Sequence, residues 1–150
     1  MSGQPMNEKL QETVETFQML DPQLRLEMLL DYANNLPPLP ERLHEARDAG
    51  LGRVVECQSP VFLYTDVVPG ENGGRDTVRI WADVPEQAPT VRGFVSLLVD
   101  ALDGATPQEV AATPDDLLRQ TGIGPSLGMT RQRGLQAVLH RIKHAVAEKA

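Results

Sequence analysis

Cys57 is the only cysteine in the 150-residue chain and the residue with the most distinctive chemistry. It lies in the polar stretch Glu56-Cys57-Gln58-Ser59-Pro60, between the apolar runs Val54-Val55 and Val61-Phe62-Leu63. A polar stretch of this length between two strands predicts a hairpin tip, where a thiol is accessible. The alternative is a small buried side chain, which is the usual state of a free cysteine. One cysteine forms no internal disulfide and no four-thiolate cluster, so chemistry at Cys57 requires a second molecule.

Three other residues are candidates for roles near this thiol. Asp83 ends a predicted strand, where it either anchors the turn into the next helix or contacts a partner. Arg92 begins the following helix and either forms a salt bridge on the helix face or contacts a partner. Gly134 lies early in the last predicted helix, where glycine costs about 1 kcal/mol relative to alanine. A close contact with the Cys57 loop or with a neighbouring helix would explain that glycine.

We expect no metal and no cofactor. His140 and His144 are four residues apart, as metal ligands on a helix can be, but no third ligand is evident nearby. A solvated helix face is the favoured interpretation of this pair. Gly122-Ile123-Gly124 lacks the lysine and hydroxyl residues of a phosphate-binding loop.

Length and charge limit the classes of function. The composition, with 41% hydrophobic and 23% charged residues, predicts one soluble globular domain over residues 1–150. A net charge of −7 would be repelled by phosphate backbones, so we expect no direct nucleic-acid binding. Residues 1–10 lack the features of a secretory signal, and no segment approaches the roughly 18 apolar residues of a membrane span. Together with the lone cysteine, these features predict a cytoplasmic protein.

Helices are predicted at both ends of the chain. Apolar stripes with helical spacing predict two helices before residue 35, a short helix over 41–49, a main helix over 91–102 and a final helix after 128. Three dipeptides mark helix starts because each pairs a capping residue with proline at the first helical position: Asp21-Pro22, Thr106-Pro107 and Thr113-Pro114.

Strands are predicted in the middle of the chain. β-branched and aromatic runs indicate strands at 54–55, 61–68 and 77–84, and alternation in the last directs Val78, Ile80, Ala82 and Val84 to one face. We therefore expect a small antiparallel sheet of about three strands, with one face packed on helices from both termini. This order of elements predicts an α+β fold.

Four motifs occur in an order and at a spacing that resemble one known family. They are Glu56-Cys57-Gln58-Ser59-Pro60-Val61-Phe62-Leu63, Ala82-Asp83 with Val91-Arg92-Gly93-Phe94, Thr106-Pro107-Gln108-Glu109-Val110, and Arg131 with Gly134-Leu135. In this arrangement they resemble the SufE family of sulfur acceptors over nearly the whole chain. Glu56 stands where many members carry glycine.

The resemblance implies a fold, a partner and an activity. The fold would be that of the IscU scaffold proteins. A pyridoxal-phosphate cysteine desulfurase of the SufS type would pass persulfide sulfur to Cys57, and Cys57 would pass it to a SufBCD-type scaffold for iron–sulfur cluster assembly. The chain would act with that desulfurase as its activator rather than as a stand-alone enzyme, and would need no cofactor of its own.

Seven residues are expected to support the Cys57 loop or to contact the partner: Glu56, Gln58, Ser59, Asp83, Arg92, Arg131 and Gly134. Glu56 disfavours the thiolate, so we expect the partner to supply most of the activation, with Arg131 or Arg133 helping if the last helix begins near the loop. Three alternatives remain at this point. They are a redox sensor or peroxidase based on one thiol, a noncatalytic adaptor, and a sulfur acceptor for a different desulfurase.

Overall fold

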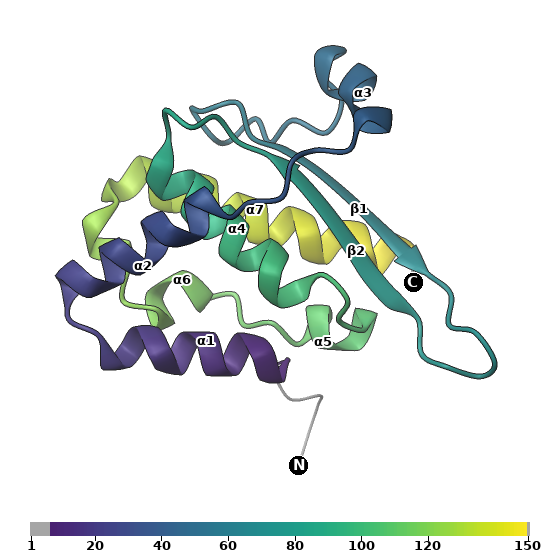
Figure 1. Cartoon of the computed structure of the whole chain (residues 1–150), viewed down its shortest axis with the longest axis horizontal. Coiled ribbons are helices and arrows are strands. Elements are labelled where there is room, and N and C mark those ends of the chain that lie inside the picture. Colours follow the sequence, from purple (N-terminus) through teal and green to yellow (C-terminus); the bar gives the residue numbers. More distant parts are fainter. Residues whose placement is uncertain (1–6, 150) are drawn as a thin grey trace.

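A computed structural model describes residues 7–149, and its elements confirm the predicted order of helices, strands and helices (Figure 1). The ends of the expected domain, residues 1–6 and 150, lie outside the described part. The elements are α1 (Glu8–Met19), α2 (Pro22–Asn34), η1 (Glu41–Leu43), α3 (His44–Asp48), β1 (Phe62–Val68), β2 (Thr77–Asp83), α4 (Pro89–Leu102), α5 (Pro107–Ala111), α6 (Leu117–Gln120), η2 (Gly124–Ser126) and α7 (Gly128–Lys149). Within residues 7–149, no helix is both long and apolar enough to cross a membrane.

Two of the three predicted helix starts are confirmed. The Asp21 carboxylate accepts a hydrogen bond from the Leu24 amide at 2.9 Å and caps α2. Thr106 and Glu109 form a capping box at the start of α5. The third start was wrong: the Thr113 hydroxyl donates back to the Glu109 carbonyl at 3.2 Å, and α6 begins at Leu117. Thr113 thus closes the turn that follows α5, and its hydroxyl does not cap α6.

The sheet has two strands in the described residues, fewer than the three expected. β1 and β2 pair antiparallel, from Phe62 opposite Asp83 to Val68 opposite Thr77. In place of the predicted strand at 54–55 there is a single bridge between Arg53 and Phe62. The chain turns at once after this bridge, so too few residues remain to continue the pairing. The α+β class itself is confirmed.

Helix α4 lies at the centre of the fold, packed against α1, α2, α7 and β2. The inner sheet face is the predicted one, with Val78, Ile80, Ala82 and Val84 buried. Where α2 crosses α4, a Cβ on Gly93 would lie 2.3 Å from the Leu29 carbonyl oxygen. Glycine therefore permits a backbone approach that alanine would block. In contrast, α3 buries no side chain and stands beside one end of the β ribbon, apart from the helical body (Figure 1).

Candidate functional site

The Cys57 loop is a tight turn held by backbone hydrogen bonds. The Val54 amide donates to the Val61 carbonyl at 2.8 Å, and the Cys57 amide donates to the Val54 carbonyl at 3.1 Å. Pro60 has no amide hydrogen to add to this set. Val55, at the outer side of the turn, is 74% exposed, whereas Val54 is fully buried. The loop therefore presents one side to solvent and directs the other into the protein.

Cys57 points inward, against the last helix. Cys57 is only 7% exposed, so the expectation of an accessible thiol at a hairpin tip was wrong for this conformation. A Cβ on Gly134 would lie 3.0 Å from Sγ of Cys57 and 3.3 Å from its Cα. The missing side chain of Gly134 leaves a notch in α7 that receives the thiol. The predicted close contact at Gly134 is thus confirmed, and it is made with the Cys57 loop.

Residues from three of the sequence motifs meet at a small cavity of ≈ 80 Å³ beside the thiol. It is lined by Cys57, Gln58, Ser59, Val91, Thr130, Arg131, Gly134 and Leu135. The start of α7 is therefore near the loop, as the interpretation of Arg131 required. Arg133 points elsewhere and lines a separate, open groove together with Glu56.

Burial makes Cys57 a weak acid in this conformation. Desolvation, followed by the negative charge of Glu56, raises the pKa of the Cys57 thiol to about 11, although the positive charges of Arg141 and Arg53 act in the opposite direction. The expected unfavourable effect of Glu56 is confirmed. Arg141 and Arg53 were missed in the sequence, although Arg141 follows Gly134 by seven residues and so lies on the same helix face. At neutral pH the thiol is protonated and poorly nucleophilic.

The rate of Cys57 alkylation is expected to rise with pH until about 11 in the folded protein, because the raised pKa keeps the thiol protonated below that value. In protein unfolded with urea, the rate should level off above about 8.5, the pKa of a free cysteine. Iodoacetamide labelling followed by intact mass measures both profiles. A folded protein whose rate levelled off near pH 8.5 would contradict the buried, protonated thiol.

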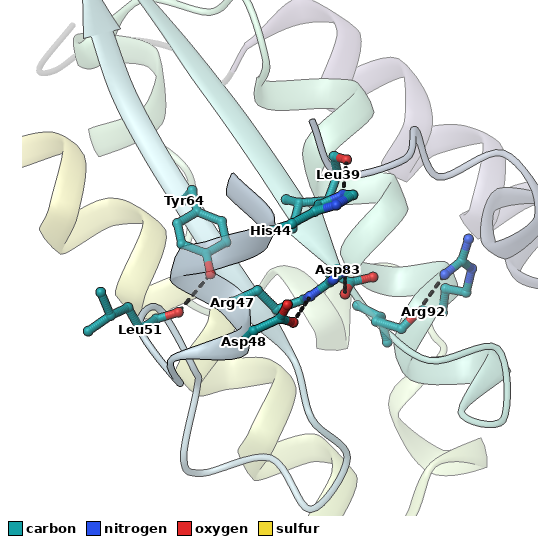
Figure 2. Close-up of polar contacts among 9 residues, drawn as sticks. Leu39, His44, Arg47, Asp48, Leu51, Tyr64, Asp83 and Arg92 are labelled. Atoms are coloured by element: carbon teal, nitrogen blue, oxygen red, sulfur yellow. Dashed lines mark hydrogen bonds and ion pairs between the residues drawn. The ribbon is translucent and has the colours of Figure 1, made fainter. Parts of the chain in front are cut away.

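Asp83 and Arg92 do not line the thiol cavity. Both form polar contacts that hold together the elements around the site (Figure 2). The Asp83 carboxylate accepts a hydrogen bond from Arg47 at 3.0 Å, which ties α3 to the end of β2. Of the two interpretations of Arg92, the salt bridge is not found within residues 7–149. The Arg92 guanidinium instead donates to two backbone carbonyls, Ala33 at 2.7 Å and Val84. Arg92 thereby joins the end of α2 to the β2–α4 connection.

The His140 and His144 side chains are exposed on α7, which confirms the expected solvated face. Their rings stack at a centroid distance of 6.3 Å. His144 also contacts the Glu148 carboxylate, one turn further along the helix. These interactions follow from the helical spacing and place neither ring in the thiol cavity.

The fold and the site together define a small α+β protein that holds one thiol in a loop against its last helix. The model of the SufE family, described as an Fe-S metabolism associated domain, matches residues 11–146. A SufE-like protein of Mycobacterium tuberculosis is 37% identical over 139 residues, which cover 93% of this chain and 92% of that protein. The chain belongs to the SufE family.

Two further comparisons agree with this assignment. The cysteine desulfuration protein SufE of Plasmodium falciparum is 28% identical over 90% of this chain and 52% of its own length. The solution structure of a hypothetical protein from Thermus thermophilus superposes with a TM-score of 0.81 at 35% identity, covering 97% of this chain and 98% of that one. Family membership supports a sulfur-transfer role in iron–sulfur metabolism and implies a cysteine desulfurase as partner.

Proposed function

We propose that Cys57 accepts persulfide sulfur from a SufS-type cysteine desulfurase in the cytoplasm and delivers it to a SufBCD-type scaffold. The observation that carries this proposal is the environment of Cys57. The only thiol of the chain shares its cavity with Arg131, Gly134 and Leu135, which form the last of the family-like motifs. This shared cavity links the family assignment to one reactive atom.

Sulfur transfer at Cys57 is a thiol exchange. The Cys57 thiolate attacks the outer sulfur of the donor persulfide, the donor S–S bond breaks, and the donor cysteine leaves as a thiolate. One proton leaves Cys57 and one is available to the donor thiolate, so the step needs no oxidant or reductant. Cys57 then carries the persulfide. The second transfer repeats this exchange, with Cys57 as the leaving group.

The buried resting position requires a movement during transfer. A thiol that is 7% exposed cannot enter the active site of another protein, so the turn between Val54 and Val61 must swing outward on docking. Leaving the cavity also removes the desolvation that raises the pKa of Cys57. Between transfers the cavity of ≈ 80 Å³ has room for one additional sulfur atom, because about 10–15 Å³ of such volume is enough for a water molecule.

The surrounding residues have supporting roles in this proposal. Gln58 and Ser59 form the loop wall of the cavity, and Gly134 provides the notch. Asp83 and Arg92 support the site indirectly, by holding the elements around it in place through contacts with other parts of this chain.

One incubation separates this function from the alternatives. The protein is incubated with a cysteine desulfurase and cysteine, and its intact mass is then measured. A gain of one sulfur atom by the wild type, but not by Cys57→Ser, is the expected result. Gain of oxygen after peroxide without any gain of sulfur would indicate the redox sensor instead. Absence of both would indicate the adaptor.

The burial of the thiol argues against the redox sensor. Sensor cysteines combine exposure with a low pKa, because the thiolate is the form that peroxide oxidises. Cys57 has the opposite properties, being buried with a pKa of about 11. A desulfurase of another system is the alternative partner, and comparing two desulfurases in the same mass assay resolves this choice.

Arg131→Ala is expected to slow net sulfur gain by about tenfold, because Arg131 lines the cavity to which Cys57 returns after transfer and its positive charge there stabilises the negatively charged persulfide. The rate of sulfur gain is measured at several desulfurase concentrations, with Arg133→Ala as the control. Arg133 carries the same charge on the same helix but lines the other groove. If both variants accept sulfur at the wild-type rate, Arg131 has only a structural role.

A further inference from the structure

Arg141 contacts the chain segment that leads into Cys57 at two points. Its Nη1 donates to the Arg53 carbonyl at 3.1 Å, and its Nη2 lies 3.7 Å from Oε1 of Glu56. One side chain of α7 therefore contacts both ends of the segment 53–56. Glu56 is bonded directly to Cys57, so the second contact is adjacent to the reactive residue.

The two contacts lie on the same helix as the notch that receives the thiol. Gly134 and Arg141 are seven residues apart on α7, which places them on one face about two turns apart. Sγ of Cys57 packs at the first position, and residues 53–56 are held at the second. Outward movement of Cys57 must carry Glu56 with it. The Glu56–Arg141 pair therefore has to separate when the thiol leaves the notch.

We infer that Arg141 is a positioning residue for Cys57, which clasps residues 53–56 onto α7 and so keeps the thiol in the Gly134 notch until a sulfur donor docks. The inference rests on the proposed function only in taking Cys57 as the working thiol. The clasp is a property of the isolated protein, so it can be tested without a desulfurase. A failed sulfur transfer and a failed clasp are thus separate results.

Arg141 has two effects on the thiol, and they have opposite signs. Its positive charge favours the thiolate and lowers the pKa of Cys57. If charge were its only contribution, removing Arg141 would slow alkylation. If it clasps the loop, removing it exposes the thiol more often and accelerates alkylation. The direction of the change therefore separates the two roles.

The test is the alkylation of Cys57 by iodoacetamide, a neutral reagent whose approach does not depend on protein charge. At low salt, Arg141→Ala is expected to react about fivefold faster than the wild type. The variant loses one charged hydrogen bond and one weak ion pair, so the loop opens more often. A rate equal to or below that of the wild type would overturn the clasp. Circular dichroism melting checks that every variant remains folded.

Arg133→Ala is the matched control. Arg133 is exposed on the same helix, lines the same groove as Arg141, and has no salt bridge within residues 7–149. Its removal changes the net charge equally and leaves both clasp contacts intact. We expect its alkylation rate to stay within about twofold of the wild type. Equal acceleration in both variants would mean that the effect does not depend on the two contacts of Arg141, and would overturn the inference.

Salt and a double mutant test the ion-pair half of the clasp. Arg141 and Glu56 are 38% and 53% exposed, so salt screens their attraction. Raising NaCl from about 50 mM to about 500 mM should accelerate the wild type but not Arg141→Ala. Glu56→Gln should accelerate alkylation more in the wild type than in Arg141→Ala, because the second background has no pair to lose. Salt-independent rates and equal effects of Glu56→Gln in both backgrounds would overturn the ion-pair contact.

Discussion

Gly93→Ala is expected to lower the free energy of unfolding by about 3 kcal/mol, because an added methyl group cannot fit where α2 crosses α4. The new Cβ would lie 2.3 Å from the Leu29 carbonyl oxygen and 2.8 Å from Cγ of Leu29. Side-chain rotation relieves only the second contact. The first is with backbone, so the two helices must separate, and the interface that centres the fold is loosened. The intrinsic gain of alanine over glycine in a helix, about 1 kcal/mol, is too small to compensate.

Urea unfolding followed by circular dichroism measures this loss. A thermal midpoint lower by roughly 6–12 °C should accompany it for a chain of this size. Gly134→Ala is the matched control, since it makes the same chemical change within a helix but meets a loop. An unchanged midpoint in Gly93→Ala would mean that α2 and α4 tolerate a wider spacing, contrary to the packing described above.

Gly134→Ala is expected to accelerate alkylation of Cys57 about tenfold with little change in stability, since reactivity of a thiol follows its exposure. The alanine methyl would lie 3.0 Å from Sγ of Cys57, 3.3 Å from its Cα and 3.5 Å from the Glu56 carbonyl oxygen. The loop must therefore move away from α7. The cost of this displacement is offset by the helix preference of alanine, about 1 kcal/mol.

The two measurements together make this prediction specific to the notch. Iodoacetamide labelling reports the exposure of the thiol, and urea unfolding reports global stability. A variant that lost stability and gained reactivity in parallel would indicate general loosening of the fold. A variant with wild-type reactivity would show that the loop adapts to the methyl group while the thiol remains buried.

Local patterns in the sequence predicted most of the elements, because the interactions that form them are local. The caps at Asp21 and Thr106 bond to amides three residues away, and alternation over 77–84 correctly identified the buried face of β2. The prediction of a strand at 54–55 was wrong, because strand pairing depends on the neighbouring strand as well as on β propensity. The prediction that Thr113 caps the next helix was wrong. Its hydroxyl can bond either to an amide of the following helix or to a carbonyl of the preceding one, and the sequence pattern does not distinguish the two.

A lone cysteine and ordered motifs are visible without coordinates, so the residues alone indicated the candidate reactive atom and the family that the chain resembles. The state of that atom depends on contacts that form only in the folded chain. Cys57 is buried because Gly134, 77 positions later in the chain, leaves space for it, and Arg141 holds the adjoining segment. Burial and charge depend on what surrounds a side chain in space. The polar residues that flank Cys57 in the sequence therefore predicted an exposed thiol, and that prediction was wrong.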